Sequence, residues 1–321
     1  TTPANRKLIN QYLKYPEDSA GSLMTNEYVY FRSGITVAKA FEIIREYGVD
    51  KETIYTCYVT SSRKELLGVV TVREMLLTAP ETIIDTLMDT NPIHVHTHDD
   101  QEEIAKMFSR YDMLAMPVVD SENRIVGIIT IDDAVDVIQD ENTEDIKKMA
   151  AIIPSDEDYM KTSVWSLVAH RLPWLMLLMI SATFTSTIIT HFETLLSGAV
   201  LLTAFIPMLM DSAGNSGSQT SVTVIRNLAL GEIELRDWPH VLAKEIGVAI
   251  VSGAALALVN FLRIIIFTST SMMIAAVVSV TLFCTVIIAM IVGCLLPIGA
   301  KKLGFDPAVM ASPMITTIVD A

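Results

Sequence analysis

Charge divides this chain into two parts that cannot fold in the same surroundings. Residues 1–162 contain 29 acidic and 16 basic side chains, whereas residues 163–321 contain only 8 acidic and 7 basic ones. The second part is rich in Leu, Ile, Val, Met and Ala, in apolar runs of the roughly 20 residues that a helix needs to cross a bilayer. The sequence therefore predicts a soluble acidic module followed by an all-α transmembrane domain.

The acidity limits the partners of this protein. The whole chain has a formal net charge of −14, which disfavours nucleic acids and anionic lipid surfaces as partners and favours cations. The three cysteines, Cys57, Cys284 and Cys294, do not have metal-ligand spacing. We therefore expect them to be buried free thiols.

A repeat of about 60 residues organises the acidic part. The segment Gly68-Val-Val-Thr-Val-Arg-Glu recurs 59 residues later as Gly127-Ile-Ile-Thr-Ile-Asp-Asp, and Ser22-Leu-Met-Thr-Asn resembles Thr86-Leu-Met-Asp-Thr-Asn. Short β-branched runs with Gly between them predict a strand, a helix, a strand, a tight turn, a strand and a helix in each copy. We expect the first helices at 37–47 and 101–111, the turns at 61–65 and 120–124, and the two copies packed face to face.

These motifs resemble a tandem pair of CBS domains over roughly residues 22–140. The Gly-x-x-Thr-x-x-Asp motif of that family is present as Gly127, Thr130 and Asp133; the first copy departs at its last position, with Gly68, Thr71 and Glu74. The resemblance implies binding of an adenine nucleotide such as ATP, with the Thr130 hydroxyl and the Asp133 carboxylate holding the ribose. The alternative is that Thr130 only ends a strand and Asp133 caps the helix that follows.

Three histidines precede the helix of the second copy. His94, His96 and His98 alternate along a predicted strand, so they share one face. Three imidazoles on one face are able to bind a transition metal. The alternative is that Ile93 and Val95 form the buried face and the histidines are merely solvated.

An acidic helix is expected after the repeat. Asp133, Asp136, Asp140 and Glu144 are spaced to lie close to one helical face, and Lys147 and Lys148 offset only part of this charge. Divalent cations would relieve the repulsion between these carboxylates. The alternative is a solvated acidic linker. Three further carboxylates on and near the helix of the second copy are placed to join the same cluster: Asp100, Glu102 and Asp112.

The second part of the chain predicts five membrane helices. We expect spans at 164–190, 195–217, 241–267 and 272–300, and an incomplete fifth helix after Asp306-Pro307. Basic residues gather in the loops on one side, so the acidic module is expected in the cytoplasm and the protein in the cell (inner) membrane. The stretch 220–240, with Trp238, is interpreted as an amphipathic segment at the lipid interface.

Polar groups interrupt two of these apolar helices. The second contains Asp211, Gly214, Asn215, Gly217 and Gln219, and the fifth carries Ser312, Thr316 and Asp320 at i, i+4 and i+8. Such groups are costly in lipid unless they line a wet cavity or contact a neighbouring helix. They predict an ion pathway, in which a two-fold dimer would present two Asp320 carboxylates to one cation. The alternative is that Asp320 lies near the end of its span, where its charge costs little.

Together these parts resemble the MgtE family of magnesium channels. The residues that carry this resemblance are Pro207, Gly214-Asn-Ser-Gly-Ser-Gln219 and Asp306-Pro-Ala-Val-Met-Ala-Ser-Pro-Met-Ile-Thr-Thr-Ile-Val-Asp320. The resemblance implies a homodimer in the lipid bilayer with a central Mg²⁺ pore, a hydrated ion at Asp320, and closure by cytoplasmic Mg²⁺ bound to acidic residues. The implied sensing carboxylates are Asp100, Glu102, Asp112, Asp133, Asp136, Glu141, Glu144 and Asp145.

The same resemblance divides the chain into domains. We expect a remnant of a preceding region at 1–21, CBS domains at 22–88 and 89–141, a connecting helix at 142–162 that plugs the pore over about 143–160, and the pore domain at 163–321. The chain departs from the family where Ser312 replaces the usual Asn, in lacking a helical N-terminal domain, and in its incomplete last helix.

Two other classes of function remain open at this stage. One is a carrier that couples another divalent ion, such as Co²⁺, Mn²⁺ or Ca²⁺, to protons or Na⁺. The other is a membrane-bound receptor for adenine nucleotides without transport. An enzyme is not expected, because neither a His-Glu-x-x-His motif nor a catalytic pair of aspartates is present.

Overall fold

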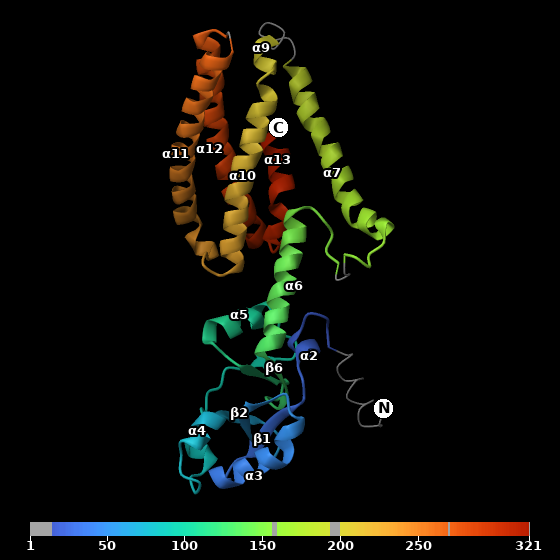
Figure 1. Cartoon of the computed structure of the whole chain (residues 1–321), viewed down its shortest axis with the longest axis vertical. Helices are drawn as coiled ribbons and strands as arrows, with labels where there is room; N and C mark the ends of the chain where they lie inside the picture. Colours follow the sequence, from blue (N-terminus) through green and yellow to red (C-terminus); the bar gives the residue numbers. More distant parts are fainter. Residues whose placement is uncertain (1–14, 156–158, 193–199, 269, 321) are drawn as a thin grey trace. The chain divides into compact units, whose positions relative to one another are not determined.

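The structure is a computed structural model that describes residues 15–155, 159–192, 200–268 and 270–320. It consists of two compact units, Thr1–Asn142 and Thr143–Ala321, which are described separately (Figure 1). The sequence expectations at residues 1–14 and 193–199 and at Ala321, which include most of the N-terminal remnant and the start of the second span, lie outside the described residues.

The first unit contains the two predicted repeats. The first comprises β1 (Tyr28–Arg32), α3 (Val37–Tyr47), β2 (Thr53–Thr60), β3 (Leu66–Thr71) and α4 (Val72–Leu76). The second comprises β4 (Val95–His96), α5 (Gln101–Tyr111), β5 (Ala115–Val119), β6 (Ile125–Thr130) and α6 (Ile131–Met149). In each sheet the first strand pairs in parallel with the second, which pairs antiparallel with the third. The predicted α+β units, their first helices and their tight turns are confirmed.

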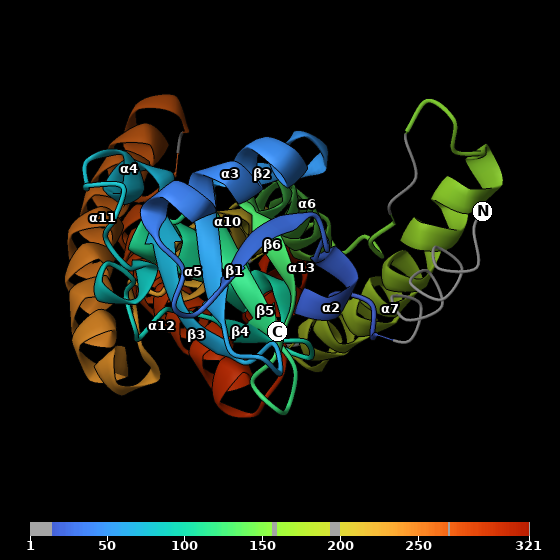
Figure 2. The same ribbon diagram turned by 90° about the horizontal axis from the view of Figure 1, so that it is seen from below.

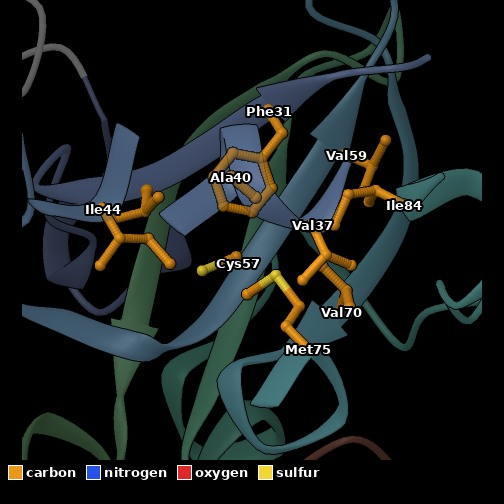
Figure 3. Close-up of a cluster of buried hydrophobic side chains, with 10 residues drawn as sticks. Phe31, Val37, Ala40, Ile44, Cys57, Val59, Val70, Met75 and Ile84 are labelled. Atoms are coloured by element: carbon orange, nitrogen blue, oxygen red, sulfur yellow. The ribbon is translucent and has the colours of Figure 1, made fainter. Parts of the chain in front are cut away.

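Each repeat has its own apolar core. In the first, Val37, Ala40 and Ile44 form the buried face of α3 and pack on Phe31 and Cys57 of the sheet (Figure 3). Burial raises the pKa of the Cys57 thiol to about 12, so this cysteine is an inert part of the core. Cys294 is also buried, but Cys284 is exposed, so the expectation of three buried thiols is wrong for Cys284.

The repeats interlock through their N-terminal segments. The helix α2 (Ala20–Leu23) and Met24 pack into the core of the second repeat, whereas Ile84 and Met88 pack on the first. Gly127 makes this possible, because a Cβ there would lie 2.7 Å from Met24 Sδ; at Gly68 it would lie 2.6 Å from the carbonyl oxygen of Asp89. The repeated glycines of the sequence therefore mark the two positions where these segments cross the sheets.

The two repeats also meet at their hairpin turns. The Leu66 amide donates to the Asn123 carbonyl at 2.9 Å, and the Ile125 amide donates to the Lys64 carbonyl at 3.0 Å. Side chains of both repeats, among them Tyr28, Tyr58 and Ile128, form a shared buried cluster. The expected face-to-face packing is therefore confirmed, and the strands of the two sheets lie next to one another in Figure 2.

The helix that leaves the second repeat is shorter than expected. The α6 helix ends at Met149, and Ala151 adopts a positive φ of 54°, so the predicted helix over 143–160 is wrong. The chain after it is irregular up to Ser163 in its described part. Only residues 143–149 of the expected plug segment are helical in α6.

The second unit is helical. It contains α7 (Val164–His191), α9 (Val200–Thr203), α10 (Ile206–Ala229), α11 (Trp238–Phe267), α12 (Met272–Lys302) and α13 (Ser312–Asp320), with short turns η3 (Leu235–Asp237) and η4 (Pro307–Met310). Three described helical segments are long and apolar enough to cross a membrane: Val164–His191, Leu235–Phe267 and Met272–Lys302.

The second predicted span differs most from the structure. α10 continues to Ala229 rather than ending at Gly217, and α11 already begins at Trp238. The predicted amphipathic segment at 220–240 is therefore wrong, because most of it belongs to these two helices. α10 is long enough to cross a bilayer but is more polar than α11 and α12.

Candidate functional site

The helices α10 and α12 approach each other unusually closely. A Cβ on Gly293 would collide with the carbonyl oxygen of Gly217, and a Cβ on Gly217 would lie 3.0 Å from the carbonyl oxygen of Ala289. Small residues allow membrane helices to pack backbone against backbone. Gly217 and Gly293 therefore hold the polar segment of α10 against the most apolar helix of the unit.

The short helix α13 packs antiparallel against α10. Gly214 faces Thr316, whose Cγ2 would lie 2.9 Å from a Cβ at that glycine, and Gly217 faces Ile315. Further along, the Ser221 hydroxyl donates to the Met310 carbonyl at 3.4 Å. Asp320 follows Thr316 by one helical turn, about 6 Å. It therefore lies near the level of residues 210 and 211 of α10.

A polar stripe runs along the exposed side of α10. Asp211, Asn215 and Gln219 are spaced by four residues, so they share a helical face, and all three are exposed. A lipid-facing stripe of this kind would leave a carboxylate and two amides without hydrogen-bond partners in hydrocarbon. The stripe must therefore meet water or a second protein surface. The structure brings Thr316 and Gly214 together; Ser312 is the first residue of α13.

A basic side chain joins the end of α6 to the start of this site. Lys148 Nζ lies 2.7 Å from Glu144 Oε1 and 2.7 Å from Asp306 Oδ2. Next to it, Met149 packs on Ile225, Ala308 and Ala311. Asp306 also caps η4, because its Oδ1 accepts from the Ala308 amide at 2.8 Å.

The Lys148 ammonium is firmly held in its charged form. Burial alone would lower the pKa of Lys148, but hydrogen bonds to the Asp306 and Glu144 carboxylates raise it well above the ordinary value. Lys148 therefore remains protonated throughout the physiological range. Sequence reasoning assigned no role to Lys148 or to the Asp306 carboxylate. Only the i, i+4 spacing of Glu144 and Lys148 pointed to one half of this contact.

Several predicted sensing carboxylates already have structural partners in the first unit. Asp100 Oδ1 caps α5 by accepting from the Glu102 amide at 2.9 Å, and Glu102 pairs with Lys106 at 3.0 Å. Glu141 of α6 accepts from Gln101 Nε2 of α5 at 2.9 Å. Asp112 ends α5 in the left-handed conformation.

The remaining members of that set lie along α6. Asp136 is exposed, and Asp133, Glu144 and Asp145 are half-buried. Within the described residues, no three His, Cys, Asp or Glu side chains converge as ligands of one metal ion. The set is therefore distributed along α5 and α6 rather than gathered at one point. The histidines His94, His96 and His98 follow the same rule: they are exposed around the buried Val95, as the alternative interpretation expected.

The two copies of the CBS motif make the same local contact. The Thr130 hydroxyl donates to Asp133 Oδ2 at 2.8 Å, and the Thr71 hydroxyl donates to Glu74 Oε2 at 2.7 Å. In each copy the acidic side chain thus reaches back to the residue at which the strand ends. The longer Glu74 side chain completes a capping box, in which its carboxylate also accepts from the Thr71 amide at 2.7 Å.

A buried polar cluster in the helical unit was not anticipated. Asn260 of α11 is only 5% exposed. Its side-chain amide donates to the Ser279 hydroxyl of α12 at 3.3 Å, and Arg263 Nη2 donates to Asn260 Oδ1 at 2.9 Å. This cluster links α11 to α12 and satisfies their polar groups internally. A single Asn in a long apolar run was the sequence signal that could have revealed it.

The fold and this site define a multi-pass membrane protein that carries a CBS pair at its N-terminal side. The family model MgtE, described as a divalent cation transporter, matches residues 206–321, and the CBS domain model matches residues 20–80 and 84–140. This chain belongs to the MgtE family. Its relatives are named magnesium transporters, a class of protein that is not an enzyme.

Three curated relatives extend the match to nearly the whole chain. The magnesium transporter MgtE of Thermus thermophilus is 36% identical over 318 residues, which cover 99% of this chain and 70% of that protein. The MgtE of Bacillus subtilis is 36% identical over 98% of this chain and 69% of its own length. The MgtE of Enterococcus faecalis is 32% identical over 97% of this chain and 68% of its own length.

Among solved structures, two soluble portions of magnesium transporters are similar to the first unit. A crystal structure of the cytosolic domain of the Mg²⁺ channel MgtE in complex with ATP is 40% identical, with a TM-score of 0.42, and covers 42% of this chain and 55% of that one. A crystal structure of the soluble part of a magnesium transporter is 35% identical, with a TM-score of 0.43, and covers 44% and 55%.

Proposed function

We propose that this protein is a Mg²⁺-selective channel that imports Mg²⁺ across the cytoplasmic membrane as a homodimer. The observation that carries this proposal is the exposed polar stripe of α10, formed by Asp211, Asn215 and Gln219, beside the helix that bears Asp320. A stripe of this composition is stable in a membrane helix when it lines a wet path. Membership of a family of divalent cation transporters supports the same conclusion.

The chemistry of the stripe suits a hydrated divalent ion. Asp211 and Asp320 supply charge at about the same level of two adjacent helices, and the amides and Thr316 supply oxygens that accept hydrogen bonds from water. Mg²⁺ gives up its water reluctantly, so protein groups contact it largely through that water. A second copy of the chain, placed so that the two stripes face each other, would double the negative charge around one ion.

The stripe offers a direct test of the pathway. Replacing Asn215 and Gln219 together with Leu removes two polar groups from the path, and we expect Mg²⁺ flux into proteoliposomes to fall at least tenfold. The measurement is the fluorescence of an enclosed Mg²⁺-sensitive dye. Val222→Leu, an exposed apolar position on the same helix, is the matched control. Wild-type flux in the Leu double variant would place the path elsewhere.

The same preparation distinguishes a channel from a carrier. A channel gives single-channel currents in a planar bilayer, and its flux does not depend on a proton or Na⁺ gradient. Flux that requires such a gradient, without measurable single-channel events, would replace the channel by a carrier.

Gating by cytoplasmic Mg²⁺ is the second part of the proposal. The carboxylates of α5 and α6 repel one another, and bound Mg²⁺ would offset this repulsion and favour the arrangement in which the pore is closed. The contact between α6 and η4 through Lys148 supports this coupling, because η4 leads directly into α13. A change in the position of α6 would therefore act on the helix that carries Asp320.

Lys148→Met tests this coupling. Without its ammonium, Glu144 and Asp306 are left as two like charges, which destabilises the contact between α6 and η4. We expect the cytoplasmic Mg²⁺ concentration that halves the current to rise about fivefold to tenfold, as the loss of a partly exposed pair of ion pairs would produce. Lys148→Arg should retain the wild-type value. An unchanged inhibitory concentration in Lys148→Met would remove Lys148 from the gating mechanism.

An adenine nucleotide at the CBS pair is a further part of the proposal. The Thr130 hydroxyl and Asp133 carboxylate lie 2.8 Å apart at the start of α6, where a ribose would be able to share their hydrogen bond. Glu74 occupies the equivalent place in the first copy. Asp133→Asn should weaken ATP binding to the protein, as measured by calorimetry, if the ribose is held there.

A further inference from the structure

A hollow of about 500 Å³ lies between the two repeats of the first unit. Its walls come from β1, from the hairpin turn of each repeat and from the end of η1 (Gly48–Asp50). Basic and aromatic side chains line most of it: Tyr28, Tyr30, Lys51, Arg63, Lys64 and Arg124. None of these residues was assigned a role in ion transport or in the CBS motif.

The charge of the hollow is opposite to that of its surroundings. Residues 1–142 contain 24 acidic and 13 basic side chains, yet four of those basic side chains line this hollow and only one carboxylate, Asp120, joins them. Like charges are brought together at a cost, so a concentration of cations in an acidic unit favours an anionic ligand.

Most of this positive charge is not neutralised within the unit. Arg124 is paired with Asp120 at 2.7 Å and with Glu122 at 2.9 Å. In the part of the chain that the structure describes, Lys51 and Arg63 form no ion pair, and the Lys64 ammonium lies 5.4 Å from the centre of the Tyr30 ring. Three cations therefore remain available to a bound anion.

The backbone holds these side chains in place before any ligand arrives. The two hairpin turns are joined by the hydrogen bonds from Leu66 to Asn123 and from Ile125 to Lys64. Lys64 itself adopts a left-handed conformation with a φ of 67°. The Tyr28 hydroxyl donates to the Ile125 carbonyl at 3.2 Å, and its ring lies 5.9 Å from that of Tyr30. A preformed site of this kind loses little entropy on binding.

The hollow is separate from the Thr–Asp motif of the second repeat. Arg124 and Ile125 lie at the start of β6 and Thr130 lies at its end, about 17 Å away along an extended strand. A single nucleotide bound by the ribose at Thr130 and Asp133 would therefore not need these cations.

We propose that this hollow binds a phosphorylated anion of nucleotide size, with its phosphates on Lys51, Arg63 and Lys64 and an aromatic base, where present, beside the exposed part of the Tyr30 ring. Phosphate oxygens accept charge-assisted hydrogen bonds from ammonium and guanidinium groups, and the ring of Tyr30 offers a surface for stacking. The inference deepens the proposed nucleotide binding and rests on it for the identity of the ligand, but it places the phosphates at the hairpin turns.

The test is calorimetric titration of the full-length protein in detergent, without divalent ions, with ATP and separately with inorganic tripolyphosphate. The variant is Lys51→Gln with Arg63→Gln. We expect it to weaken the binding of both ligands about 30-fold or more, since each lost charge-assisted contact costs roughly a factor of ten. Arg110→Gln, an exposed cation on α5 away from the hollow, should bind like wild type. Thermal melting should show all variants folded.

The outcomes separate this site from the CBS motif. Loss of both ligands in the double variant, with Asp133→Asn unaffected, supports the hollow. Loss of ATP in Asp133→Asn with normal binding in the double variant overturns the hollow and leaves the nucleotide at Thr130 and Asp133. Failure of the wild-type protein to bind either ligand overturns both proposals. Tripolyphosphate binding without ATP binding identifies an inorganic oligophosphate as the ligand.

Discussion

Replacing Asp320 with Ala is expected to lower Mg²⁺ flux at least 100-fold. Asp320 is the only carboxylate of α13, and the low dielectric of a membrane helix makes a compensating charge essential for a cation that approaches it. A factor of 100 corresponds to about 2.7 kcal/mol, which is modest for the loss of one charge in such surroundings. The measurement is dye-detected Mg²⁺ uptake into proteoliposomes.

Two further variants separate charge from polarity at this position. Asp320→Asn keeps an oxygen ligand but removes the charge, so we expect it to be nearly as inactive as Asp320→Ala. Asp320→Glu keeps the charge and should retain part of the flux. Glu232→Gln, which removes an exposed carboxylate from the loop after α10, is the matched control. Normal flux in Asp320→Ala would exclude Asp320 from the ion path.

The second large effect is expected at Gly293. A side chain at this position would collide with the backbone of Gly217, and backbone atoms of a packed helix cannot move aside as a flexible side chain can. Gly293→Val should therefore force α10 and α12 apart and destabilise the helical unit by about 3 kcal/mol or more.

Gly293→Val should also abolish Mg²⁺ flux, because α10 carries the polar stripe and supports α13. Thermal unfolding in detergent and proteoliposome flux measure the two effects. Gly299→Val, at a glycine of the same helix with open space around it, is the matched control. A Gly293→Val protein with wild-type stability would mean that the close approach of α10 and α12 is not required.

The sequence predicted the repeat architecture in detail because the information is local. The Gly68 and Gly127 segments, the alternating apolar residues and the turn residues each determine their own short stretch of backbone. The first, third and fourth spans were also predicted to within about three residues at each end, because long apolar runs leave a helix little alternative in a membrane.

The failures have a common physical cause in contacts between distant residues. α10 was expected to end at Gly217, because Gly and Ser disfavour a helix in isolation. In the structure these small residues allow contact with α12 and α13, and the packing maintains the helix to Ala229. Lys148 and Asp306 are 158 residues apart, so no local pattern could pair them. The polar residues of the second and fifth predicted helices were identified correctly as a group, but which of them face each other depended on the antiparallel packing of α13.

The exchange of N-terminal segments between the repeats makes the CBS pair a single cooperative body. Neither repeat closes its own core: Met24 completes the second, and Ile84 and Met88 complete the first. A ligand that shifts one sheet must therefore move a segment of the other, and partial unfolding of one repeat exposes apolar surface in both. The pair is thereby suited to combine a nucleotide signal and a cation signal into one response rather than reporting each separately.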